Sequence, residues 1–194
     1  SDTAVGTLFQ KAGIIRVESR AAMINAACML SISKGPLKGK RICVVTDAGG
    51  PGVLMSDELN RQGLDLPLLK SETRDLLGKI LPPESSTANP IDALPSRTAD
   101  QIKAIIQLLG ERERDTIDAI AILLGDSGMS DNSQIYQAIS EAMGHCPIPV
   151  VPMLSSVFSS KGIIEDFISQ GNVFFPDEVP LARTLPMASF NTKL

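Results

Sequence analysis

The feature that most constrains the fold is the change from an apolar run to a glycine-rich turn within residues 41–55. β-branched and other apolar residues fill positions 42–45, and helix-compatible residues resume at Val53. This order predicts a buried strand, a tight turn and a helix. We call the turn residues the glycine corner: Ala48, Gly49, Gly50, Pro51 and Gly52. Glycines permit backbone dihedrals that are closed to other residues, and Pro51 sets its own φ near the helical value.

A helix that starts at such a corner exposes its first amide N–H groups and the positive end of its dipole. An anion, most often a phosphate, is the natural occupant of that position. We therefore predict a phosphate site at the glycine corner. Close packing of a helix on a strand can also require glycines at this point, so a purely structural role stays open.

The corner does not match two common nucleotide motifs. Its glycines fall as G-G-P-G rather than G-x-G-x-x-G, and the next apolar segment, 66–69, ends at Lys70 where a ribose-binding acid is expected. No Gly-Lys-Ser/Thr follows, which excludes a P-loop.

Composition narrows the class of protein further. Of 194 residues, 43% are apolar and none is tryptophan, so we expect one aliphatic core. The net charge of −4 comes without any basic run, which argues against nucleic acid or a membrane surface as a partner. No apolar stretch reaches the roughly 18 residues of a membrane span.

The cysteines and the single histidine do not suggest catalysis or a metal site. Cys28, Cys43 and Cys146 lie apart in apolar surroundings, as reduced core thiols of a cytoplasmic protein would; a nucleophilic cysteine is the weaker alternative. His145 falls between a helix end and a strand start, where a helix-terminal role is favoured over that of a phosphoryl carrier. We predict no catalytic residue and no metal ligand in this chain.

Strand and helix patterns alternate along most of the sequence. Strands are expected near 41–46, 65–69, 118–124, 149–154 and 173–175, and helices near 1–11, 19–31, 52–63, 71–80, 98–109, 131–143, 160–170 and from 177. Right-handed crossovers then give a parallel sheet covered on both faces. We predict an α/β fold: a flavodoxin-like, doubly wound five-stranded parallel sheet in three α/β/α layers, with strand order 2-1-3-4-5.

The inward faces of two helices can be read from the apolar spacing. Met23, Ala26, Ala27 and Leu30 share one face of the helix at 19–31, and Ile102, Ile105, Ile106 and Leu109 share one face of the helix at 98–109. The charge run 111–115 is expected to be a solvated helix end.

Ligands of such sheets bind beyond the carboxyl ends of the strands. This rule brings together segments 47–52, 89–92, 125–130 and 155–156. Asp47, Asn89, Asp92 and Ser127 are the possible contacts beside the corner. Asn89 and Asp92 are equally suited to fixing a turn, and Ser155 and Ser156 to capping the next helix.

Segment 45–54, followed by Asn89-Pro90-Ile91-Asp92, resembles the signature of ADP-forming acyl-CoA synthetases, the acetate–CoA ligases related to succinyl-CoA synthetase. The opening residues 1–17 resemble that family's junction after its phosphohistidine domain. The resemblance implies residues 1–33 as leading helices and junction, and 34–190 as the flavodoxin-like ligase-CoA domain of the α portion. Asp47 departs from the family, which usually has asparagine at this position. An added carboxylate would repel a phosphate unless it points away or is neutralised.

The resemblance also implies a function. In that family an acyl-CoA, ADP and phosphate give acid, CoA and ATP, and a histidine outside this chain carries the phosphoryl group. CoA, ADP or ATP, phosphate and Mg would bind in the full enzyme, and no cofactor to this chain alone. The partners would be a phosphohistidine domain, a CoA-binding domain and an ATP-grasp domain, with a homo-oligomer also possible. The chain starts without methionine, so we expect an excised piece of a longer protein. The resemblance implies that this piece is inactive alone. A non-catalytic flavodoxin-like anion-binding or regulatory module is the alternative.

Overall fold

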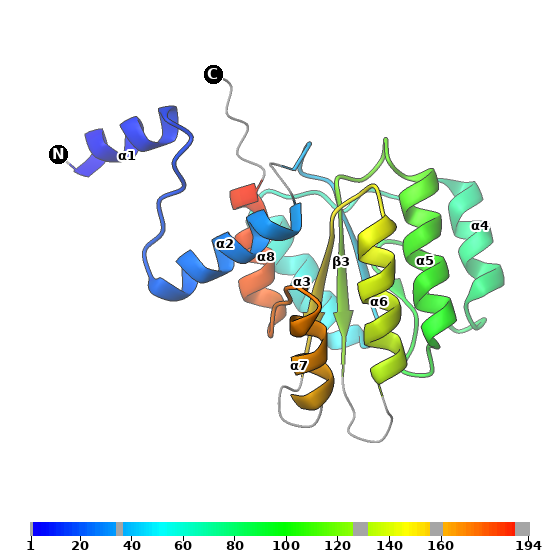
Figure 1. Ribbon diagram of the computed structural model, residues 1–194. Coiled ribbons are helices and arrows are strands. Elements are labelled where there is room, and N and C mark those ends of the chain that lie inside the picture. Colours follow the sequence, from blue (N-terminus) through cyan, green and yellow to red (C-terminus); the bar gives the residue numbers. More distant parts are fainter. Residues whose placement is uncertain (1, 34–36, 126–131, 156–160, 189–194) are drawn as a thin grey trace.

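A computed structural model describes residues 2–33, 37–125, 132–155 and 161–188. At its centre lies a sheet, of which Figure 1 labels β3. The sheet has four strands, all parallel, in the order β2-β1-β3-β4. The strands are β1 (Ile42–Thr46), β2 (Ile91–Asp92), β3 (Ala119–Leu124) and β4 (Val150–Leu154). Every residue of β1, β3 and β4 is buried, as expected for strands that are covered on both faces.

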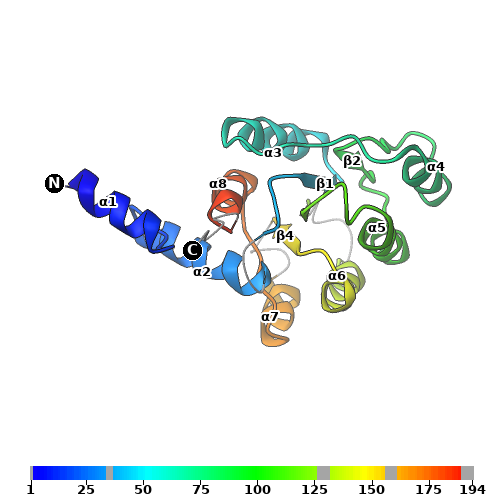
Figure 2. The same cartoon turned by 90° about the horizontal axis from the view of Figure 1, so that it is seen from above.

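Helices cover both faces of the sheet (Figure 2). Their bounds are α1 (Asp2–Lys11), α2 (Arg20–Ser33), α3 (Gly49–Arg61), α4 (Ser71–Ile80), α5 (Ala99–Arg112), α6 (Ser133–His145), α7 (Lys161–Ser169) and α8 (Glu178–Ala188). Because side chains alternate along a strand, Cys43 and Val45 pack toward α4–α7 while Ile42 and Val44 pack toward α2, α3 and α8. The predicted α/β class with a parallel sheet is confirmed.

The helix predicted at 98–109 shows how local sequence defines an element. Thr98 and Gln101 form a capping box at the start of α5, in which each side chain accepts from the backbone amide of the other residue. The predicted apolar face of this helix is fully buried: Ile102, Ile105, Ile106 and Leu109. The helix and its apolar face depend on local sequence, so both could be predicted.

The prediction of a second strand at 65–69 is wrong. Only Asp65 bridges to Arg41, and Ile91–Asp92 lies beside β1 instead. The Asn89 side chain explains the exchange: it accepts from the Val44 amide (2.9 Å) and donates to the carbonyls of Ile42 (2.8 Å) and Pro67 (3.1 Å). This amide fills the ladder positions between β1 and the 65–69 segment.

A fifth strand is not seen in the described part of the chain. Of the predicted segment 173–175, Phe175 makes a single parallel bridge to Met153, through bonds with Pro152 and Leu154. Extension of this ladder toward the start of β4 would need the Pro152 nitrogen as a donor, and proline has no N–H. The proline therefore prevents the ladder at this edge from extending toward the start of β4.

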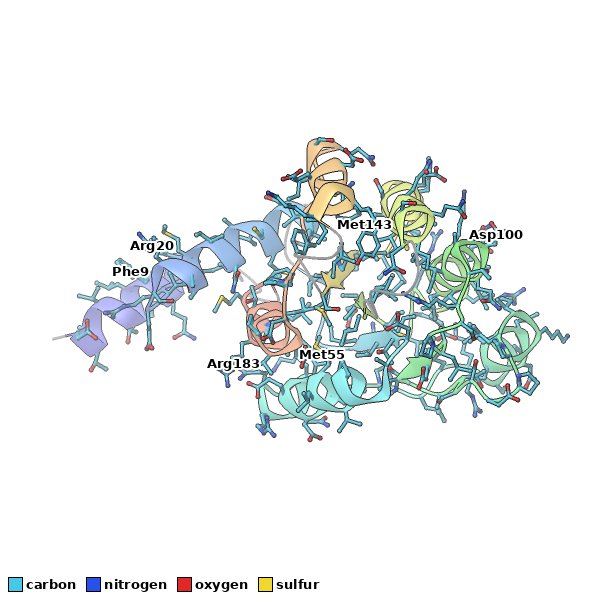
Figure 3. The ribbon with its side chains drawn as sticks, turned by 90° about the horizontal axis from the view of Figure 1, so that it is seen from below. Phe9, Arg20, Met55, Asp100, Met143 and Arg183 are labelled. Carbon is cyan, nitrogen blue, oxygen red and sulfur yellow. The ribbon has the colours of Figure 1, made fainter. Side chains whose placement is uncertain are left out.

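α1 and the start of α2 form an arm that extends away from the sheet; Figure 3 labels Phe9 and Arg20 on it. α1 has no buried residue, and α2 packs its Met29 into the core that it shares with α8. The face predicted for α2 is wrong in part, since Met23 is 57% and Leu30 40% exposed. The alanine-rich helix offers several apolar faces, and the position of α8 selects the one with Ala26 and Met29. None of the described helices is long and apolar enough to cross a bilayer.

Candidate functional site

The glycine corner follows directly from the end of β1. The Thr46 hydroxyl donates to the Ala48 carbonyl (2.8 Å) and accepts from the Ala48 amide (3.1 Å), which closes the turn between strand and helix. Ala48 then occupies the N-cap of α3 with extended backbone dihedrals and no side-chain cap. The start of α3 is thereby held by β1 and not by a capping side chain.

The first amides of α3 are open to solvent. Gly49 and Gly50 are exposed, and a Cβ at either position would meet nothing within 4 Å. Their N–H groups have no acceptor in the described part of the chain, whereas the Gly52 amide donates to Ala48 within the helix (3.3 Å). Pro51 has no N–H to satisfy. Two bare donors thus lie at the positive end of a 13-residue helix, which is a suitable position for an anion.

The expectation that these glycines supply unusual dihedrals is wrong. Among the described glycines only Gly13, Gly63 and Gly171 have a positive φ. Gly52 is needed for space, because its Cβ would lie 3.0 Å from Thr46 Cγ2. What Gly49 and Gly50 contribute is the absence of a side chain over the bare amides.

Asp47 points away from the open side of the corner and into the protein. Its side chain is 3% exposed and forms an ion pair with Arg97 (Nη2 to Oδ2, 2.8 Å), while its Oδ1 accepts from the Gly125 amide (2.8 Å). Burial raises the pKa of the Asp47 carboxyl, and the Gly125 amide and the Arg97 guanidinium act in the opposite direction. The carboxylate therefore points away from the corner and is paired with a cation. These are the two conditions under which it would not repel a phosphate bound at the corner.

Asp92 lies at the carboxyl end of β2, in register with Thr46. Its Oδ1 accepts from the Leu94 amide (3.0 Å), and its charge contributes to the raised pKa of Asp47. The Asn89 side chain lies beside the middle of β1, away from its carboxyl end. It forms hydrogen bonds there with the backbone of β1 and of Pro67. The structure therefore brings Asp47 and Asp92 together and gives Asn89 a structural role.

The remaining predicted contacts come from segments 125–130 and 155–156. The described residues of these segments, Gly125 and Ser155, lie at the same carboxyl edge of the sheet. Gly125 lies beside the corner, with its Cβ position 3.9 Å from the Ala48 Cβ. The Ser155 amide and hydroxyl both donate to the Leu124 carbonyl. Ser127 and Ser156 lie outside the described residues.

Other candidate groups lie away from the corner. His145 is exposed and is the last residue of α6, which confirms the expected helix-terminal position. Cys43 is fully buried, whereas Cys28 and Cys146 are only partly buried. A cavity of about 690 Å³ opens at the amino edge of the sheet, lined in part by Lys38, Arg114 and Asn172.

Two buried charged side chains, Arg97 and Glu113, were not predicted from the sequence. Arg97 lies in a turn between a proline and a helix start, and no periodicity marks it as buried. Glu113 belongs to the charge run predicted to be solvated, yet it is fully buried and accepts from the Lys70 amide (3.1 Å). Each has a partner more than 40 residues away along the chain: Asp47 for Arg97 and Lys70 for Glu113.

The chain is similar in sequence to two ADP-forming acetate–CoA ligases. No family model matches the chain. It is 31% identical over 145 residues to the α subunit of acetate–CoA ligase (ADP-forming) II from Pyrococcus furiosus, covering 72% of the chain and 31% of that protein. It is 28% identical over 186 residues to acetate–CoA ligase (ADP-forming) I from Archaeoglobus fulgidus, covering 96% of the chain and 26% of that protein.

Solved structures show the same fold. A Pyrococcus horikoshii protein superposes with a TM-score of 0.85 at 22% identity, over 99% of this chain and 45% of that one. Acetyl-coenzyme A synthetase 1 from Candidatus Korarchaeum cryptofilum, solved with phosphate and ADP, superposes with a TM-score of 0.84 at 20% identity, over 99% of this chain and 41% of that one. The chain thus spans about a quarter to a third of the two curated relatives' length.

Proposed function

We propose that this chain, which is distantly homologous to ADP-forming acetate–CoA ligases over most of its length, is one domain of an ADP-forming acid–CoA ligase. The reaction is conversion of acyl-CoA, ADP and phosphate into acid, CoA and ATP. The observation that supports this proposal most strongly is the pair of unpaired amides of Gly49 and Gly50. They lie at the start of α3, open to solvent at the carboxyl edge of the sheet. A flavodoxin-like, doubly wound arrangement is the fold we assign to this domain.

The role of the corner is electrostatic. A phosphoryl group on a histidine of another domain would be held by the amides of Gly49 and Gly50 and by the positive end of α3. Preformed donors of this kind stabilise charge on a transferring phosphoryl group without covalent chemistry. Nothing in the corner supplies a nucleophile, since its five residues are alanine, glycine and proline.

The partners follow from this role. The phosphohistidine domain, a CoA-binding domain and an ATP-grasp domain would contribute the groups that bind CoA, ADP or ATP, phosphate and Mg. The synthetase from Candidatus Korarchaeum cryptofilum was solved with phosphate and ADP. In this proposal the described chain contributes the anion-stabilising helix end and no cofactor site of its own.

The test is Gly50→Val in the complete ligase. The valine side chain would enter open space, so the fold is retained, but it would cover the amides that receive the phosphoryl group. We expect loss of phosphoryl transfer to and from the histidine, measured with labelled ATP, and little change in thermal unfolding. Gly78→Val in α4 is the matched control, because a Cβ there also meets nothing within 4 Å and lies far along the chain from the corner.

Two outcomes would contradict the proposal. Wild-type turnover in Gly50→Val would remove the corner from the reaction. Binding of phosphate by the chain without any stimulation of a phosphohistidine-bearing partner would favour a regulatory anion-binding module.

A further inference from the structure

Arg97 occupies a buried position below the glycine corner. Its side chain is 4% exposed and has acceptors on several separate segments. Nη1 donates to the Pro95 carbonyl (2.8 Å), and Nη2 approaches Asp47 Oδ2 (2.8 Å), the Gly125 carbonyl (3.2 Å) and Asn132 Oδ1 (3.1 Å). One guanidinium thereby links the ends of β1 and β3 with the start of α6.

The charges around this link bear directly on an anion at the corner. Asp47 precedes Ala48 in the chain, and its carboxylate is buried, so solvent screens it little. Asp92 adds a second acidic group close enough to affect the pKa of Asp47. Without Arg97, the corner would have uncompensated negative charge beneath its positive helix end.

Hydrogen-bond donors are in excess at this point. Arg97 Nε and Asn132 Nδ2 are buried and have no acceptor in the described part of the chain. The Asp47 carboxylate already accepts from Arg97 and from the Gly125 amide. The Asp47 carboxylate is thus paired with one cation and one amide donor, and two further donors lie on the residues around it.

We propose that Arg97 is a positioning residue of the anion site: it neutralises Asp47 and fixes the strand ends that present the glycine corner. The inference rests on the proposed function, since it assumes that the corner receives a phosphoryl group. It also accounts for an aspartate beside a phosphate site, because the paired carboxylate adds no net charge. Arg97 acts through Asp47 and touches no reacting atom in this scheme.

The test compares Arg97→Gln, Asp47→Asn and the double variant in the complete ligase. The readouts are the apparent KM for inorganic phosphate, the rate of histidine phosphorylation and the unfolding temperature. Both single variants leave one buried charge without its partner, so both should unfold at lower temperature. Their electrostatic effects on an anion, however, have opposite signs.

Arg97→Gln leaves a net negative charge and should raise the KM for phosphate about tenfold, the order of magnitude expected for one added unit charge near an anion at an intermediate dielectric constant. Asp47→Asn leaves a net positive charge and should lower that KM, in spite of its lower stability. The double variant has neither charge and should return the KM for phosphate, the rate of histidine phosphorylation and the unfolding temperature toward the wild type. A merely structural pair would instead raise the KM in both single variants, in proportion to the loss of stability.

The outcomes separate this inference from the proposed function. If Gly50→Val is inactive but Arg97→Gln and Asp47→Asn both raise the KM for phosphate, only the role of Arg97 is overturned. If Gly50→Val has wild-type turnover, both fail together. Should Arg97→Gln not fold, Asp47→Asn still decides by the direction in which the KM changes.

Discussion

The Cα atom of Gly52 lies against the Thr46 side chain, so that a Cβ at Gly52 would be 3.0 Å from Thr46 Cγ2. Thr46 cannot easily move aside, because its hydroxyl is bound to both the amide and the carbonyl of Ala48 and its side chain is buried. The strand end, the turn and the helix start therefore interlock at this point. Gly49 and Gly50 are free of such contacts.

Gly52→Ala should destabilise the chain by about 1–3 kcal/mol, the usual cost of overpacking a close contact. Gly50→Ala should change stability by no more than about 0.5 kcal/mol, since its Cβ meets nothing and its φ is not positive. Urea unfolding of both variants measures the difference. Equal costs would mean that the Thr46 contact does not limit the packing of α3.

Glu58 should make stability depend on pH in the acid range. Its side chain, 4% exposed on α3, accepts from Arg183 of α8 (2.8 Å), Gln62 (3.0 Å) and Arg61 (2.7 Å), and these donors lower its pKa to about 2. Figure 3 shows Arg183 on α8 and Met55 between the two helices. A lowered carboxyl pKa adds stability above the ordinary value of 4.5, and that stability is lost as the pH falls toward 2.

Glu58→Gln should therefore be less stable than the wild type at pH 7, and the gap should close between about pH 4.5 and pH 2. Thermal unfolding at several pH values measures the gap. Glu165→Gln is the control, because Glu165 is 65% exposed and its nearest cation is 3.8 Å away. A gap that stays constant down to pH 2 would exclude ionised Glu58 as its source.

Asn89 should be required for stability and not for phosphoryl transfer. Asn89→Asp removes the two N–H donors to the Ile42 and Pro67 carbonyls and places a carboxylate beside them. We expect a loss of about 1–3 kcal/mol, the cost of leaving buried polar groups unpaired. Urea unfolding measures the loss, and hydrogen exchange at the Val44 amide shows whether the opening is local. An inactive variant with unchanged stability would instead make Asn89 part of the site.

The three cysteines should differ in reactivity in the native chain. Cys43 is fully buried in β1, and burial raises its pKa, so it should react with a thiol reagent only after unfolding. Cys28 and Cys146 are partly exposed and should react without denaturant. Mass spectrometry of the modified peptides assigns each site. Fast native labelling of Cys43 would show that the core next to β3 opens readily.

Local pattern determined much of this protein by itself. The apolar run at 119–124 contains no polar residue to face solvent. It therefore predicts a strand that is buried on both faces, as the structure shows. The capping box of α5 and the break after Thr46 are equally local, which is why the position of the glycine corner could be predicted. The physical reason is that caps, turns and buried runs act over a few residues.

Only the tertiary structure decided which distant groups meet. The Asn89 amide displaced the predicted second strand, Pro152 limited the pairing of Phe175 with β4, and Arg97 reached Asp47 across 50 positions of the chain. Glu113 looked solvated in sequence and became buried against Lys70. Whether a side chain is paired or exposed depends on the packing of helices and strands around it, and that packing is not a property of any single segment.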